Sequence, residues 1–154
     1  RGQAQPGSGI FAAANRALLQ SWYWPDDAWL WIHPAQKTAR QLLKQGNWDA
    51  LLSVSLPFSA HWIARSLKAQ YPTLTWLADI GDPLALQTDH PLNNPILYQK
   101  RNRRAERSVL EKADVATLTN ENLRTKYLEL FPDLHTPLQV IPPLASFLRD
   151  PDSA

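Results

Sequence analysis

Two aspartates, Asp79 and Asp82, lie three residues apart directly after a predicted strand, in the segment Leu77-Ala-Asp-Ile-Gly-Asp-Pro83. A carboxylate in this place can accept hydrogen bonds from ligand hydroxyls, serve as a general base, or coordinate a metal through oxygen. Aspartate also caps turns well, so a structural role for either residue stays open. No other oxygen-rich cluster stands nearby in the sequence, and we therefore expect no metal site.

A second polar segment, Ser53–His61, joins a predicted strand to a predicted helix. Free N–H groups in the first turn of that helix would face a ligand and favour an anion. His61 lies off the apolar stripe of the helix, which leaves two interpretations: a surface or supporting histidine, or a contact to a ligand hydroxyl or phosphate. Ser55 and Asn120, which follow two different predicted strands, complete the polar candidates. Asn120 can also cap the helix that it precedes.

A basic stripe runs along one predicted helix. Its members are Lys100, Arg103, Arg104 and Arg107, at positions i, i+3, i+4 and i+7. At 100° per residue these side chains share one face. A solvated face, anionic lipid headgroups, a phosphate-bearing ligand and RNA are the four interpretations. No aromatic residue interleaves the stripe, so we expect no nucleic-acid partner.

Strands and helices alternate along the chain. The expected strands are Trp29–His33, Asp49–Val54, Leu74–Ala78, Val115–Thr119 and Leu138–Ile141. The expected helices are Ser8–Ser21, one that Pro34 opens and Gly46 ends, one that Ser59 caps, Ile96–Ala113 and Glu121–Leu130. Alternation of this kind predicts an α/β fold, a Rossmann-like parallel sheet flanked by helices. Ligands of such sheets bind beyond the carboxyl ends of the strands, where the polar candidates stand.

Composition narrows the classes of protein. The chain has 154 residues, 44% of them hydrophobic, enough for one domain with a core. Its net charge of +2 is too small to indicate nucleic-acid binding without a concentrated patch. There is no cysteine, which fits a reducing compartment, and no apolar run approaches the roughly 18 residues of a membrane span. The first residue is Arg1, not Met, so we expect a processed chain or a fragment.

Four phrases of this sequence share their order and spacing with a known enzyme family. They are Pro25-Asp26 followed by Trp31-Ile-His-Pro34-Ala35, Asp49-Ala-Leu-Leu-Ser-Val-Ser-Leu-Pro-Phe-Ser-Ala-His61, Trp76-Leu-Ala-Asp-Ile-Gly-Asp-Pro83, and Glu106-Arg107 followed by Ala113-Asp114. Read together, they resemble the family 4-type glycosyltransferases of the GT-B fold. The resemblance covers the chain from Pro25 to about Ile141.

This resemblance implies that residues 1–154 are a single partial domain, the N-terminal acceptor-side domain of a two-domain enzyme. Such enzymes transfer a sugar from a nucleotide-sugar donor to a hydroxyl acceptor, here a sugar, a lipid-linked acceptor or another alcohol. The donor is expected to bind a C-terminal domain that this chain lacks, so the chain itself needs no cofactor. Asp82 becomes the candidate catalytic residue, and Ser55, His61, Asp79 and Asn120 the candidate acceptor-binding residues.

The sequence departs from the family pattern in three places, one of which is the absence of the family's glycine-rich first loop, and it leaves a rival interpretation. Gly81 stands where family members carry Arg or His, and Ile141-Pro-Pro-Leu144 replaces their Ile-Pro-Asn-Gly turn. The rival is a non-catalytic Rossmann-like module for binding or interaction. Whether transfer retains or inverts configuration stays open. The expected compartment is the cytoplasm, with peripheral contact at the inner membrane face as a further expectation from the basic stripe.

Overall fold

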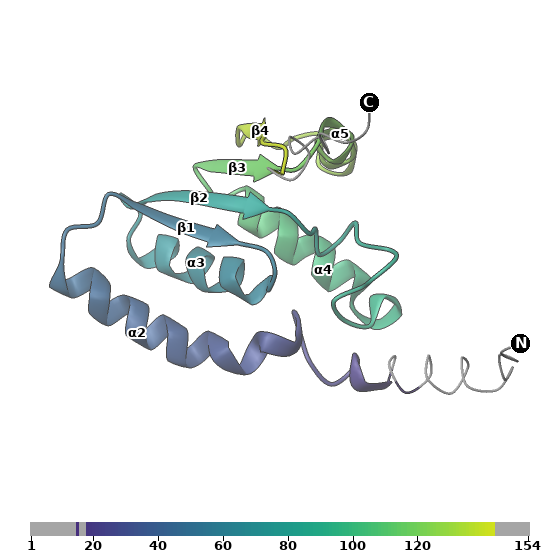
Figure 1. Cartoon of the computed structure of the whole chain (residues 1–154), viewed down its shortest axis with the longest axis horizontal. Coiled ribbons are helices and arrows are strands. Elements are labelled where there is room, and N and C mark those ends of the chain that lie inside the picture. The colour runs from purple at the N-terminus through teal and green to yellow at the C-terminus, as the bar shows by residue number, and fades with distance from the viewer. Residues whose placement is uncertain (1–14, 16–17, 144–154) are drawn as a thin grey trace, which may run out of the picture.

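Four parallel strands form one sheet in the order β1-β2-β3-β4 (Figure 1). The structure, a computed structural model, describes residue 15 and residues 18–143, so most of the helix predicted at Ser8–Ser21 lies outside the described residues. The strands are β1 Ala50–Val54, β2 Thr75–Ile80, β3 Val115–Leu118 and β4 Leu138–Val140. The helices are η1 Asp27–Trp31, a 3-10 turn, then α2 Ile32–Gln45, α3 Ser59–Gln70, α4 Pro95–Leu110 and α5 Glu121–Leu130. The predicted α/β, Rossmann-like class is confirmed.

The three crossover helices cover the same face of the sheet. In a parallel sheet, the side chains of two residues that are paired in register point to the same face. Leu51 pairs with Trp76, and Ala78 pairs with Ala116, so the members of each pair share a face. Trp76 and Ala78 pack into a core with residues of α3 and α4, which lie beneath the sheet in Figure 1. Ala116 packs into a second core with residues of α5. Crossovers of one hand between neighbouring strands place their helices on one side of the sheet, as observed for α3, α4 and α5.

The opposite side of β1 is open. Leu52 and Val54 are 62% and 43% exposed, although they belong to an apolar strand. The preceding helix, α2, packs on α3 and leaves an apolar groove of about 580 Å³ between itself, β1 and α3. Ala35, Ala39 and Leu42 recur at helical spacing along one face of α2 and line this groove. This apolar face of α2 therefore borders a groove and not a closed core.

The strand predicted at Trp29–His33 is wrong. This segment forms η1 and the first residues of α2, because the Asp26 side chain caps the turn by accepting from the Ala28 N–H at 3.1 Å. Trp29 and Trp31 are 42% and 51% exposed, so the run does not supply the two buried faces of a central strand. Pro34 fits in the first turn of α2, where its missing N–H has no partner to lose.

The other elements predicted within the described residues are confirmed, with small shifts at their ends. Asn94 caps α4 by accepting from the N–H groups of Ile96 and Leu97, so α4 begins one residue earlier than predicted and ends at Leu110. Asn120 caps α5 as predicted, accepting from the Leu123 N–H at 2.9 Å. Ser59 is not the cap of α3 but its first residue.

The carboxylates of two aspartates, buried Asp26 and exposed Asp114, join segments that are distant in sequence. Asp26, 2% exposed, accepts from the Ser59 backbone N–H at 2.8 Å and from its hydroxyl at 2.6 Å. This contact holds the start of α3 against the segment before η1. Asp114 accepts from the Trp76 N–H at 2.6 Å and from the Lys68 ammonium at 2.7 Å, which holds the start of β2. Both aspartates belong to the phrases that carry the family resemblance.

Replacing Asp26 with alanine should lower the free energy of unfolding by about 3 kcal/mol, because a buried N–H and a buried hydroxyl of Ser59 lose a charged acceptor. Urea unfolding followed by circular dichroism measures the loss. The matched control is Asp27→Ala, since Asp27 is exposed and we expect it to cost no more than about 1 kcal/mol. Equal losses in the two variants would show that Asp26 does not hold α3 in place.

Candidate functional site

The carboxyl ends of β1, β2 and β3 bring the predicted site residues to one edge of the sheet. Ser55 directly follows β1, and its backbone N–H donates to the Asp79 carbonyl oxygen at 3.0 Å. Asp79 is the second-last residue of β2, and Asp82 follows this strand by two residues. Asn120 lies two residues after β3, at the start of α5. Because the strands are parallel, their carboxyl ends face the same edge.

His61 lies beneath this edge and is fully buried. Its Nδ1 is 2.7 Å from the Ser53 hydroxyl and its Nε2 is 2.8 Å from the Ser55 hydroxyl. Ser53 in turn accepts from the Trp76 indole N–H at 2.9 Å. The interpretation of His61 as a surface histidine is therefore wrong. Both ring nitrogens are engaged by serines, so in this structure the histidine supports Ser55 from below.

The protonation of His61 follows from its burial. Burial lowers the pKa of His61 to about 4, against a smaller opposite effect of Asp79, so the ring is neutral at pH 7 and carries one N–H. A Ser53 hydroxyl that accepts from Trp76 can donate its proton to Nδ1. The Nε2–H then donates to the Ser55 oxygen. In this arrangement the Ser55 hydroxyl keeps its own proton for a ligand at the sheet edge.

The two crevice aspartates have different surroundings. Asp79 is half-buried, and its carboxylate accepts from the Thr117 hydroxyl of β3 at 2.6 Å. Asp82 is also half-buried, but its carboxylate makes neither a hydrogen bond nor an ion pair with the described part of the chain. The turn-capping alternative thus gains no support for Asp82. Its acceptor oxygens remain available to a ligand.

Glu106 of α4 fixes the loop that carries Asp82. It is fully buried, and its carboxylate accepts from the N–H groups of Leu84 and Ala85 at 2.6 and 2.9 Å and from the Tyr127 hydroxyl at 2.8 Å. Burial raises the pKa of Glu106 to about 7, although the three donors oppose this shift. Sequence reasoning missed Glu106 as a positioning residue. Two signals pointed to it: Glu106 stands in a phrase that carries the family resemblance, and it lies on the inward face of a predicted helix.

Gly81 lies where β2 and β1 end together. A Cβ built on Gly81 would lie 3.5 Å from the Ser55 carbonyl oxygen, an ordinary van der Waals contact. Its φ is not in the left-handed region that favours glycine. A side chain therefore fits at this position, and the backbone does not force the departure from the Arg or His of the resembling family.

Neither a metal cluster nor a membrane-spanning helix occurs in residues 18–143. No group of three or more His, Asp or Glu side chains there could share a metal ion. Likewise, none of the described helices combines the length and apolar character that crossing a bilayer requires. Comparison with protein-family models, with curated proteins and with solved structures gives no match to this chain.

His61 and Glu106 should give opposite pH dependences of stability. The folded protein keeps His61 neutral down to about pH 4, whereas the unfolded chain protonates it near 6.5. Stability from His61 therefore falls as the pH drops from 6.5 towards 4, by about 3 kcal/mol. Glu106 keeps its proton up to about pH 7 when folded and loses it near 4.5 when unfolded, so its effect has the opposite sign and a similar size. Between pH 4.5 and 6.5 the two should nearly cancel.

The variants Glu106→Gln and His61→Gln separate the two effects. In Glu106→Gln the free energy of unfolding should rise with pH between 4.5 and 6.5, and in His61→Gln it should fall, relative to the wild type. Urea unfolding at several pH values measures the slopes, so a constant loss of stability in either variant does not interfere. Identical slopes in all three proteins would contradict the shifted pKa values of both groups.

Proposed function

We propose that this chain is the N-terminal, acceptor-side domain of a two-domain glycosyltransferase with the GT-B fold. The observation that carries the proposal is the Asp82 carboxylate, which has no partner among the described residues and lies just beyond the carboxyl end of β2. Open α/β sheets bind their ligands at this edge. The ordered phrases of the sequence that resemble this family add the substrate class: a hydroxyl acceptor and a nucleotide-sugar donor.

The chemistry assigns a role to each site residue. In glycosyl transfer the acceptor oxygen bonds to the anomeric carbon of the donor while the nucleotide leaves, and the acceptor hydroxyl loses its proton. Asp82 would accept the hydrogen bond of that hydroxyl and orient it, or take up its proton. Ser55 would donate to another oxygen of the acceptor, with His61 holding its hydroxyl in place. Asp79, anchored by Thr117, would define the floor of the crevice.

The proposal also sets what this chain does not do alone. The nucleotide sugar is expected to bind a C-terminal domain outside this chain. This chain therefore needs no cofactor of its own. The Asn120 side chain caps α5, so any acceptor contact by this residue is secondary. The acceptor class stays broad: a sugar, a lipid-linked acceptor or another alcohol. The proposed compartment is the cytoplasm.

The apolar groove between α2, β1 and α3 favours the rival function, a non-catalytic module that binds another protein. Aliphatic side chains such as Leu42 and Leu52 line it, and it contains none of the five candidate catalytic and acceptor-binding residues. The two functions make different demands on the parent protein. A second Rossmann-like domain with paired glutamates beyond Ala154 in the parent sequence would support the transferase, and its absence would support the module.

The first test in the parent enzyme is Asp82→Asn, which keeps the shape of the side chain and removes its charge and basicity. Turnover should fall about ten- to thousandfold, because a charged hydrogen bond contributes roughly 1.5–3 kcal/mol and general-base catalysis adds to this. The melting temperature should change little, since the Asp82 carboxylate makes no hydrogen bond or ion pair with the described residues. Steady-state kinetics with a panel of nucleotide sugars and a thermal melt measure both.

The matched control is Asp79→Asn. Asp79 accepts from the Thr117 hydroxyl, so this variant should lose stability as well as activity. Near-normal turnover in both single variants and in the double variant would remove the carboxylates from the mechanism. A stability loss without an activity loss in Asp82→Asn would identify Asp82 as a turn residue.

A further inference from the structure

Two aliphatic side chains at the start of α4 are exposed. Ile96 is 95% exposed and Leu97 is 59% exposed. They are held in place, because Asn94 accepts from both of their backbone N–H groups, at 3.1 and 3.2 Å. Because the backbone of this turn is held by the cap, the two side chains leave the helix in fixed directions.

This pair continues the basic stripe of α4. Ile96 lies four residues before Lys100, seven before Arg103 and eleven before Arg107, so it shares their face of the helix. Leu97 lies seven residues before Arg104, at the border of the same face. The four cations line a hollow of about 260 Å³ together with the ring of Phe131. We name the stripe, Ile96 and Leu97 together the α4 patch.

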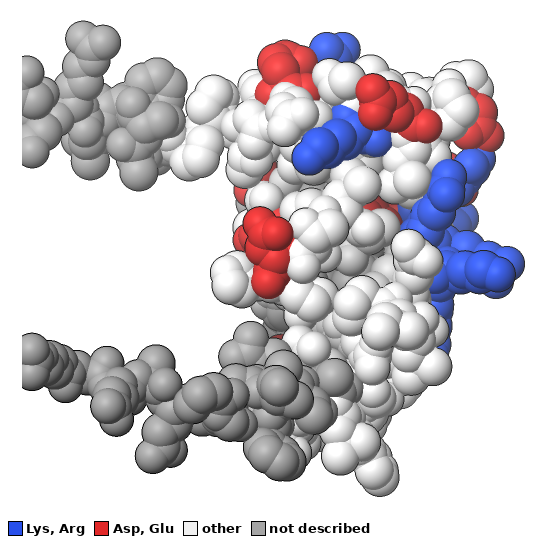
Figure 2. Space-filling view, turned by 90° about the vertical axis from the view of Figure 1, so that its right-hand side faces the viewer, with Lys and Arg blue, Asp and Glu red and all other residues white. Residues whose placement is uncertain are grey.

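The positive charge of the α4 patch is only partly neutralised. Arg107 forms ion pairs with Glu111 and Asp133. Lys100 and Arg104 are exposed and have neither an ion pair nor a hydrogen bond within the described part of the chain. Figure 2 shows Lys and Arg side chains gathered along one side of the molecular face turned to the viewer. Uncompensated cations around a hollow suit the phosphate groups of an anionic partner.

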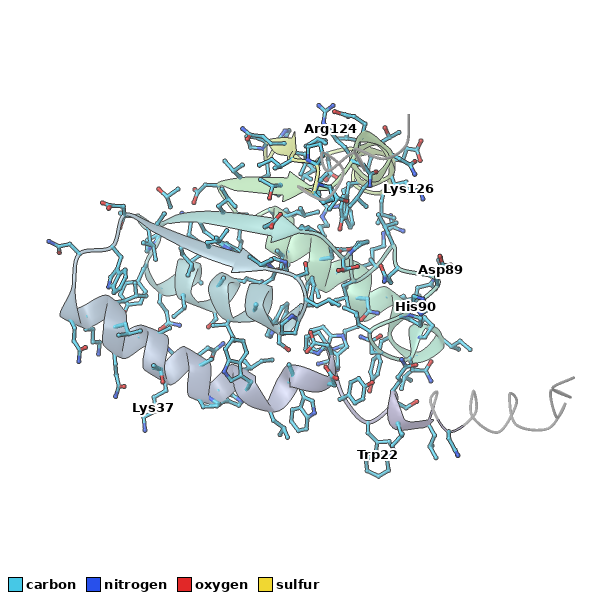
Figure 3. The ribbon with its side chains drawn as sticks, in the orientation of Figure 1. Trp22, Lys37, Asp89, His90, Arg124 and Lys126 are labelled. Atoms are coloured by element: carbon cyan, nitrogen blue, oxygen red, sulfur yellow. The ribbon has the colours of Figure 1, made fainter. Side chains whose placement is uncertain are left out.

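A second apolar group lies beside the start of α4. Leu18, Leu19 and Trp22 are 62%, 65% and 80% exposed. Their segment is tied to α4 by hydrogen bonds: the Asn94 N–H donates to the Gln20 carbonyl oxygen at 3.0 Å, and the Tyr98 hydroxyl donates to that of Ser21 at 2.7 Å. The Trp22 side chain points away from the body of the protein in Figure 3. Tryptophan is enriched where a protein meets the membrane interface.

We infer that the α4 patch docks the protein peripherally on an anionic lipid bilayer. The basic stripe binds headgroup phosphates, and Ile96 and Leu97 enter the interface beside them. A helix that lies in a membrane interface combines aliphatic and basic side chains in this way. This inference uses none of the residues of the proposed transferase site.

Vesicle pelleting at low salt tests the inference with this chain. The wild type should pellet with vesicles of phosphatidylcholine and phosphatidylglycerol but not with phosphatidylcholine alone, and added salt should release it. Lys100→Glu/Arg104→Glu should lower the partition coefficient at least about 25-fold, because each basic residue near an anionic surface is worth about fivefold. Ile96→Ser/Leu97→Ser should lower it about tenfold or more through lost apolar burial.

The matched control is Lys37→Glu/Lys44→Glu, which makes the same change of net charge on exposed residues of α2. It should keep most of the binding, since the attraction falls off within a Debye length. Wild-type protein that ignores the anionic vesicles would overturn the inference. So would a control that loses as much binding as the α4 variant, or serine variants that bind as well as the wild type. Preference of the same patch for RNA over vesicles would also contradict it.

Discussion

One buried carboxylate, that of Glu106, connects the three parts of the molecule on which the candidate site depends. It stands on α4, accepts from the loop after β2 through Leu84 and Ala85, and accepts from Tyr127 of α5. Burying a carboxyl group is costly unless hydrogen bonds compensate, and three donors meet that demand here. Because Asp82 lies two residues before Leu84, the same contact limits where the Asp82 carboxylate can lie.

The residues that carry the family resemblance serve the scaffold more than the chemistry. Asp26, Glu106 and Asp114 each accept hydrogen bonds from backbone N–H groups of other segments. Loops between parallel strands and helices leave such N–H groups without partners, and a carboxylate placed by another element satisfies them. Among the conspicuous polar residues, this leaves Asp82 and the Ser55 hydroxyl as the groups that we propose for contact with a ligand.

The two proposals use different surfaces of the same fold. The proposed transferase site lies at the carboxyl ends of β1, β2 and β3, whereas the proposed membrane-docking surface lies on the outer face of α4. The inner face of α4 carries Glu106, so one helix positions the site on one side and presents cations on the other. Binding to a bilayer would bring the site near acceptors attached to lipid. The variants that test each surface leave the other unchanged.

The sequence by itself determined the α/β class, the presence of the three crossover helices and the ends of α5. Caps and hydrophobic periodicity suffice for these features because they act over a few neighbouring residues. Asn120 before Glu121–Leu130 is one example. Only the tertiary structure decided the burial of His61. Its two ring nitrogens contact the hydroxyls of Ser53, in β1, and Ser55, directly after β1. The tertiary structure also turned Trp29–His33 from a predicted strand into helical turns, since Asp26 is held by Ser59, 33 residues away. Burial and partners depend on residues that the chain brings together only when it folds.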